Sequence, residues 1–379
     1  EDQVKELAVL PQQGFKANWV QLVILVGCLF SLGGLFGLER TLLPLMADPV
    51  WGEDDPLAIT TIVISFGFAK AIANGVAGLL SDKFGRKIIV ALGMAIGIPV
   101  PIAILVSPNW MFVTVANLGL GASQGLAASA IVLMLIDILG QSKRGIAVGL
   151  LECSIYVSVA IWSFLGVQLS QIFGYQPVPF SVGIVLAAFG ALLSLFAKDT
   201  LNLVSLEVGR SLPISIELDP IVSEENLEDQ ELTDSDSPAV VNTATTSDYW
   251  LSKKRVWYCY PSKEQESEEN LSYAQVICAC FGNKQICLCI FSGMMNNVKD
   301  GLAWVVFPLY FADDWGVDNW VIGILMLVYP LSWGILQLFT GAASDKISRK
   351  IFLVSGMLTQ GLSLLFMAVI PYIIQNDSW

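Results

Sequence analysis

Residues 78–87 read Gly-Leu-Leu-Ser-Asp-Lys-Phe-Gly-Arg-Lys, and residues 341–350 read Gly-Ala-Ala-Ser-Asp-Lys-Ile-Ser-Arg-Lys. The two stretches are 263 residues apart and agree at six of ten positions. At an offset of 264, the Gly-Leu and Pro-Leu pairs of residues 37–45 recur in residues 301–309. Two matches at nearly one offset indicate an internal repeat. Each half is expected to begin with a helix that carries these pairs, followed by a helix that ends in the basic loop.

The sequence around this repeat is that of a membrane protein. Of 379 residues, 55% are hydrophobic and only 14% are charged, whereas soluble domains carry about 25% charged residues. A membrane helix needs roughly 20 apolar residues, and nine blocks of that kind predict an all-α polytopic membrane protein. The predicted spans are residues 18–46, 57–80, 88–106, 111–138, 145–170, 178–197, 285–311, 320–342 and 351–372. This pattern excludes a soluble enzyme and a secreted disulfide scaffold, and a net charge of −13 argues against nucleic-acid binding.

Residues 201–272 have a different composition. They hold 15 acidic and 5 basic residues, and so supply −10 of the net charge of −13. Such a segment cannot bury a core, and we expect a disordered linker; a docking or phosphorylation segment with an unknown partner is the alternative. The linker separates a six-helix N-terminal half, residues 1–200, from a partial C-terminal half, residues 273–379. Because the second half has only three spans, we expect the chain to stop about three helices early.

The basic residues predict the topology. Loops near residues 47–56, 106–110, 171–178 and 312–319 contain no Lys or Arg. The opposite loops hold Lys83, Arg86, Lys87, Lys143, Arg144, Lys346, Arg349 and Lys350. Cytoplasmic loops are enriched in Lys and Arg, so the N-terminus, the acidic linker and the basic loops are expected in the cytoplasm. Which membrane holds the protein stays open.

At these residues the sequence resembles the major facilitator superfamily, whose signature loop G-x-x-x-D-[RK]-x-G-[RK]-[RK] joins helices two and three and recurs between helices eight and nine. Both copies are present here, with Ser348 in place of Gly in the second. The resemblance implies a two-half helical bundle that carries a small solute by alternating access. It also implies a cytoplasmic gate, in which an acid such as Asp82 accepts from backbone donors and pairs with Arg86. The gate residues are Gly78, Asp82, Lys83, Gly85, Arg86, Lys87, Gly341, Asp345, Lys346, Arg349 and Lys350.

Two further segments, residues 137–152 and 296–304, look like those of a group of microbial permeases of this superfamily. Two features of drug/proton antiporters are missing. In the fourth predicted span, Gly121-Ala-Ser and no Arg stands before Gln124-Gly125. In the fifth, no Gly-Pro pair lies between Gly145 and Ser170. Drug/proton antiport is therefore less expected.

Ionisable residues within spans cost about 2.5–3.5 kcal/mol each on insertion scales, which makes them candidates for function. Lys70 and Asp300 are expected to face a central cavity, where Lys70 could hold an anionic group of a substrate. Asp300 or Glu39 could carry a coupling proton, since carboxyl groups in membranes often do so. The alternative is permanent ion pairing, for example of Glu39 with Arg40. The candidates for substrate binding or coupling are Glu39, Arg40, Lys70, Asn74, Gln124, Glu152, Asn296, Asn297, Asp300, Trp304 and Gln337.

The predicted function is secondary active transport of a small solute, with protons as the candidate coupling ion. A passive uniporter and a non-transporting sensor that acts through the acidic linker are the alternatives. The chain contains no His and no catalytic constellation, so an enzyme is not expected, nor a cofactor or metal. The expected partners are the solute, protons and the lipid bilayer.

Overall fold

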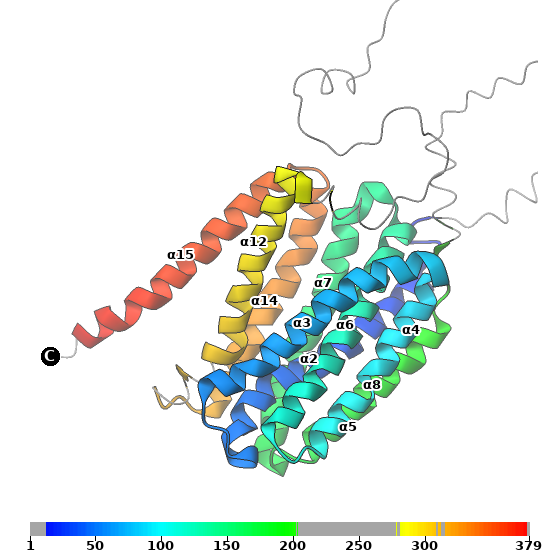
Figure 1. Cartoon of the computed structure of the whole chain (residues 1–379). Coiled ribbons are helices and arrows are strands. Elements are labelled where there is room, and N and C mark those ends of the chain that lie inside the picture. The colour runs from blue at the N-terminus through cyan, green and yellow to red at the C-terminus, as the bar shows by residue number, and fades with distance from the viewer. Residues whose placement is uncertain are drawn as a thin grey trace, which may run out of the picture. The chain divides into compact units, whose positions relative to one another are not determined.

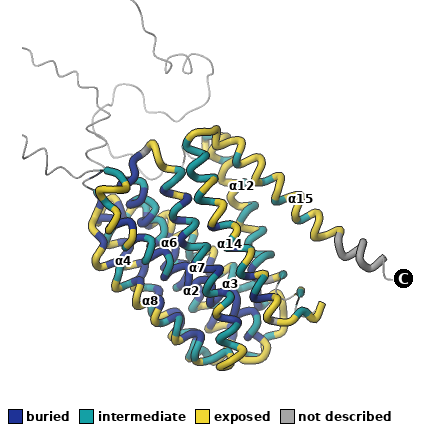
Figure 2. The backbone as a smooth tube through the Cα atoms, turned by 180° about the vertical axis from the view of Figure 1, so that it is seen from behind, coloured by how far each residue is buried: buried dark blue, intermediate teal, exposed yellow. Residues whose placement is uncertain are grey.

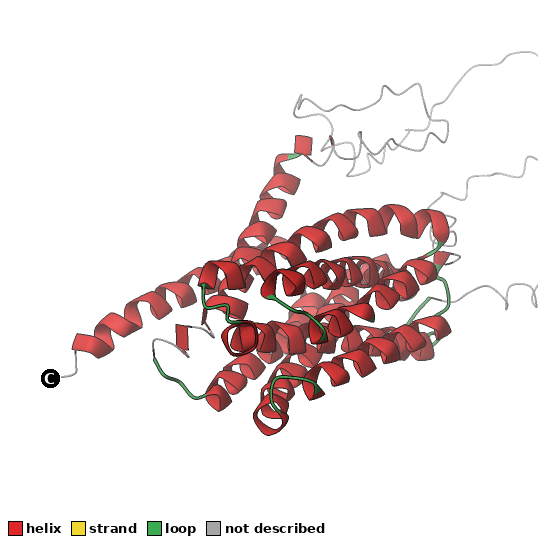
Figure 3. Ribbon diagram, turned by 60° about the horizontal axis from the view of Figure 1, so that its bottom comes forward, coloured by secondary structure: helices red, strands yellow, loops and turns green. Residues whose placement is uncertain are grey.

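The computed structural model describes residues 13–201, 203, 278, 281–307, 310–311 and 315–376 (Figure 1). Within these residues the regular elements are all helical (Figure 3). The helices are α2 (Trp19–Trp51), α3 (Pro56–Phe84), α4 (Arg86–Gly97), α5 (Pro99–Leu105), α6 (Trp110–Leu139), α7 (Arg144–Phe173), α8 (Val178–Phe196), α12 (Lys284–Gly301), α14 (Asn319–Ser344) and α15 (Arg349–Asn376), with a π-helix over Leu302–Val306. The predicted all-α membrane fold is confirmed.

The chain divides into two units. One unit comprises Glu1–Leu212 and Asn297–Trp379, and the other comprises Pro213–Asn296. Of the second unit the structure describes residues 278 and 281–296, which include the first part of α12. Apart from residues 201 and 203, the predicted acidic linker lies outside the described residues. All contacts discussed below lie within the first unit.

Eight helices of the described chain, rather than the nine expected, are long and apolar enough to cross a membrane. The six spans of the first half agree with prediction, since α4 and α5 together form one span, Arg86–Leu105. The exception is the seventh predicted span, residues 285–311. There the α-helix ends at Gly301 and a π-helix follows, and the polar residues Asn296, Asn297, Lys299 and Asp300 lower the hydropathy of the segment.

The core of the first half is built around α2. This helix packs against α7 and α8, while α6 packs against α3 and α4. Small residues bring the helices close together: a Cβ on Gly37 would lie 2.6 Å from the carbonyl oxygen of Val159 in α7. Hydroxyl groups then link the backbones, as where Ser163 Oγ donates to the Gly37 carbonyl at 3.1 Å. Close approach of small residues and interhelical hydrogen bonds are what hold membrane helices together.

The second half is represented by α12, α14 and α15. Helix α14 packs along α7, so it joins the second half to the first. By contrast, α15 has no buried residue among residues 349–369, whose burial is described, and most of these are exposed (Figure 2). Its exposed side chains are mainly Leu, Ile, Val, Phe and Met, which is the composition of a lipid-facing surface.

Candidate functional site

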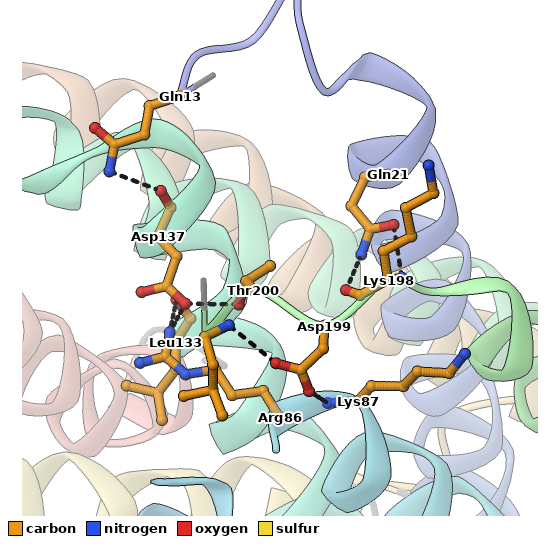
Figure 4. A network of polar contacts seen from close by, with 10 residues as sticks. Gln13, Gln21, Arg86, Lys87, Leu133, Asp137, Lys198, Asp199 and Thr200 are labelled. Atoms are coloured by element: carbon orange, nitrogen blue, oxygen red, sulfur yellow. Dashed lines mark hydrogen bonds and ion pairs between the residues drawn. The ribbon is translucent and has the colours of Figure 1, made fainter. Parts of the chain in front are cut away.

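The first copy of the repeated loop is held by two carboxylates from elsewhere in the chain (Figure 4). Arg86 forms an ion pair with Asp137 of α6, and both side chains are nearly buried, at 8% and 7% exposed. Arg86 Nη1 also donates to the Leu133 carbonyl at 3.0 Å. The close ion pair of Arg86 is thus with Asp137 rather than with the expected Asp82. Asp82 is exposed and interacts with Arg86 only electrostatically, at longer range.

A second carboxylate, Asp199, follows α8 and caps the start of α4. Its Oδ2 accepts from the Lys87 backbone N–H at 3.0 Å, which places a negative charge at a helix N-terminus, where it is stabilising. Gly85 has a φ of 94°, and a Cβ there would lie 2.6 Å from Asp199 Oδ2. The sequence motif needs glycine at this position for both reasons. The neighbouring Thr200 Oγ1 donates to Asp137 at 2.6 Å, so the two carboxylates belong to one network.

Other residues of the first copy make fewer contacts. Gly78 has open space where a Cβ would be, so no contact in the described chain explains why this position of the motif is a glycine. Lys83 is exposed, and its Nζ lies 5.4 Å from the centroid of the Phe84 ring.

The second copy of the loop makes the contact that was expected of the first. Asp345 accepts from two backbone N–H groups at the start of α7, Gly145 at 2.8 Å and Ile146 at 3.1 Å. Arg349 Nη2 lies 3.8 Å from the Asp345 carboxylate. The Asp345 side chain is 9% exposed and that of Arg349 is 67% exposed. Asp345 therefore ties α14, from the second half, to α7 in the first half.

Glycines allow this close approach. A Cβ on Gly341 would collide with the Gly145 carbonyl and lie 3.1 Å from Gly149 Cα. A Cβ on Gly149 would lie 2.7 Å from the Gln337 carbonyl oxygen. Lys346 and Lys350 are exposed beside this contact. We call the set Asp345, Gly145, Ile146 and Arg349 the basic-end latch.

A cluster of opposite charges forms further along the bundle. Glu152, Arg40 and Asp300 all interact electrostatically with Lys70, and Glu152 also interacts with Asp300. Lys70 Nζ donates to Gln124 Oε1 at 3.2 Å. Five of the predicted candidates, on five helices, are thus brought together, and we call these five residues the central charge cluster.

The guanidinium group of Arg40 also packs against two aromatic rings. Its guanidinium carbon lies 4.3 Å from the centroid of the Phe66 ring and 5.1 Å from that of Phe36. The neighbouring Glu39 is 1% exposed. Its carboxylate oxygens and the terminal nitrogens of Arg40 are buried without a hydrogen-bond partner in the described chain. Glu39 and Arg40 nevertheless interact electrostatically, so permanent pairing of the two stays an alternative to a role in coupling.

Asp300 is paired with a residue that the sequence-based list of candidates omitted. Lys299 Nζ lies 2.7 Å from Asp300 Oδ1 and 2.6 Å from the Tyr329 hydroxyl oxygen. The same hydroxyl lies 2.9 Å from Asp300. Lys299 Nζ also lies 3.9 Å from the centroid of the Trp333 ring.

Aromatic side chains form a wall beside these charges. Trp333 stacks on Tyr156 of α7, with ring centroids 5.0 Å apart, and meets Tyr329 edge to face at 6.1 Å. Trp304, a predicted candidate, contacts Tyr329 at 5.6 Å. Tyr156 interacts electrostatically with Glu152 and Asp300. Tyr156 and Tyr329 were missed because aromatic residues are frequent in apolar helices, and only their proximity to the charges singles them out.

The remaining candidates lie apart from the central charge cluster. Asn74 is exposed and accepts from Ser129 at 2.9 Å, Asn297 is exposed, and Gln337 lines a cavity beside the basic-end latch. Asn296 belongs to the other unit.

The comparison with known families agrees with this arrangement. The family model described as Major Facilitator Superfamily matches residues 27–229 and 287–379, which is more than half of the chain. A search of curated proteins gave no match.

Proposed function

The chain belongs to the major facilitator superfamily, a family of membrane transporters, and we propose that it carries a small polar solute by alternating access through the central charge cluster. The proposal depends on one observation above all: Lys70, Glu152 and Asp300, from three helices, interact with one another. Each charge costs about 2.5–3.5 kcal/mol to insert at the centre of a membrane helix. Charged residues at this depth usually mark the path of a substrate or ion.

The cluster has separate places for opposite charges. Asp300 is already paired with Lys299 at 2.7 Å. Within the described residues Lys70 has no carboxylate at ion-pair distance: it donates to the neutral Gln124 and interacts with Glu152 only electrostatically. We therefore assign Lys70 the role of binding an anionic group of the solute. Trp333 and Tyr156 form a stacked aromatic pair close to the charges, and its edges would suit a solute with an apolar part.

We assign the basic-end latch the role of the gate at one end of the transport path. It closes α7 against α14 at the end of the bundle that carries the basic loops. Access to the cluster from that end requires the two hydrogen bonds to break, and closure reforms them. The two halves would then rock about a site between them, as in other carriers built from two repeats.

We further propose that transport is secondary active. Glu39, Glu152 and Asp300 are the carboxyl groups available to carry a coupling proton. A passive uniporter is the alternative, and a pH gradient across a vesicle membrane separates the two, because only a proton-coupled carrier accumulates solute in response to it.

The test is solute counterflow in proteoliposomes that contain the whole chain, with a panel of anionic, zwitterionic and cationic solutes. We expect counterflow of an anionic or zwitterionic solute, and we expect Lys70→Met to abolish it. Lys143→Met, which removes an exposed charge, is the matched control and should transport normally. Normal counterflow by Lys70→Met would overturn the assignment of Lys70 to solute binding.

A further inference from the structure

A cavity of about 310 Å³ lies beside the basic-end latch and outside the central charge cluster. Helices α7 and α14 and the first turn of α15 form its walls. Its lining includes Arg144, Arg349, Gln337, Thr340, Val148 and Phe352. Its lining therefore combines two basic side chains with polar and apolar ones.

The two arginines that line the cavity favour the binding of an anion. Arg144 is exposed, and its guanidinium has no hydrogen bond or ion pair within the described part of the chain. Arg349 is 67% exposed and reaches Asp345 only at 3.8 Å. The Asp345 carboxylate is itself occupied by the Gly145 and Ile146 N–H groups and does not line the cavity. Both guanidinium groups are thus available to a ligand.

The surroundings indicate how an anion would arrive. Leu336, Phe339 and Ile351 are neighbours of lining residues in sequence, and they are 60%, 67% and 59% exposed. Such side chains face the acyl chains of a bilayer, while the arginines lie at the end of the helices that carries the basic loops. Basic pockets between membrane helices at this level bind phosphorylated lipid headgroups, and the planar guanidinium matches the geometry of a phosphate group.

We propose that this cavity binds a phosphate group between Arg144 and Arg349, presented by an anionic phospholipid or by a soluble phosphate. The amide of Gln337 provides a further polar group at the site. The apolar wall at Val148 and Phe352 would accept the glycerol and first methylene groups of a lipid. This site adjoins the basic-end latch, with which it shares Gly145 and Arg349, and its occupancy is measurable without a known substrate.

The test measures lipid binding to the purified whole chain by native mass spectrometry, with dioleoylphosphatidylglycerol and dioleoylphosphatidylcholine as probes. Each basic residue near an anionic lipid contributes about a fivefold change in affinity. Arg144→Gln with Arg349→Gln should therefore weaken phosphatidylglycerol binding about 25-fold, with little change for phosphatidylcholine. The matched control is Lys143→Gln with Lys350→Gln, which removes the same charge from the same two loops but from residues that do not line the cavity.

Two further measurements keep the result interpretable. Arg144→Gln alone leaves the Asp345–Arg349 contact in place, and should give about a fivefold loss with an unchanged melting temperature. Competition with inorganic phosphate then shows whether the bound phosphate group belongs to a lipid or to a soluble molecule. Displacement of the lipid by millimolar phosphate, with the same arginine dependence, assigns the site to a soluble phosphate, and retention of the lipid assigns it to a headgroup.

Two results would overturn the proposal. One is an equal loss of binding in the arginine pair and the lysine pair, which would mean that the general positive field attracts the lipid. The other is the absence of any preference for phosphatidylglycerol over phosphatidylcholine together with no binding of phosphate.

Discussion

Replacing Asp345 with alanine should release the N-terminus of α7 and open the basic-end latch. The first N–H groups of a helix have no partner within that helix. In α7 two of them, those of Gly145 and Ile146, donate to the Asp345 carboxylate at 2.8 and 3.1 Å. Their protection from solvent therefore depends on this one side chain.

The magnitude can be built from the contacts. Loss of a capping side chain costs about 1–2 kcal/mol, and loss of a negative charge near a helix N-terminus costs about 0.3–1 kcal/mol. The ion pair with Arg349 adds little, because it is long and its arginine is 67% exposed. The sum is about 2 kcal/mol, which corresponds to roughly a 30-fold change in the opening equilibrium.

Hydrogen–deuterium exchange measured by mass spectrometry reads this change directly. Peptides that cover residues 141–150 should exchange about 30-fold faster in Asp345→Ala, and Arg349→Gln should change the rate by less than about fivefold. Asp318→Ala is the matched control, because Asp318 precedes α14 without a side-chain capping bond. Exchange of the α7 peptides at the wild-type rate in Asp345→Ala would refute the latch.

Two further predictions concern the first copy of the repeated loop, and both are checked by thermal unfolding in detergent. Arg86→Met should destabilise the protein by about 3–5 kcal/mol, because it leaves the buried Asp137 carboxylate without its cation, and adding Asp137→Leu should restore part of the loss; a larger loss in the double variant would contradict the pairing. Gly85→Ala should cost about 1–3 kcal/mol, since its φ is 94° and the new Cβ would meet Asp199. The matched control Gly78→Ala, in open space on a helix, should be neutral or stabilising by up to about 1 kcal/mol, and equal losses at the two glycines would contradict this reasoning.

The membrane helices could be predicted from the sequence because their signal is local. A bilayer forces each spanning segment to satisfy its own backbone hydrogen bonds, so long apolar blocks become helices that end at residues such as Gly85, Gly140 and Gly174. Residues 285–311 are helical where the structure describes them, but the change from α-helix to π-helix after Gly301 was not predicted.

The partners of charged residues could be predicted only in part. The proposed Asp82–Arg86 pair used two residues four positions apart, whereas the actual partner, Asp137, comes from another helix. The convergence of Lys70, Glu152 and Asp300 could be anticipated, because each is an ionisable residue in an apolar span. Lys299 precedes Asp300 in the sequence and is an ionisable residue of the same span, so it too could be anticipated. Tertiary packing alone identifies Tyr156 and Tyr329 as neighbours of these charges.

The two copies of the repeat perform different mechanical tasks despite their similar sequences. In the first copy the arginine is buried and binds α4 to α6 within one half; in the second copy the aspartate connects α14 to α7 across the two halves. Breaking a buried ion pair costs about 3–5 kcal/mol, against about 2 kcal/mol for the capping contact of Asp345. The capping contact between the halves is therefore the weaker of the two polar contacts. Because α14 also packs closely along α7, loss of the Asp345 contact is expected to loosen the basic end of this helix pair rather than to separate the halves.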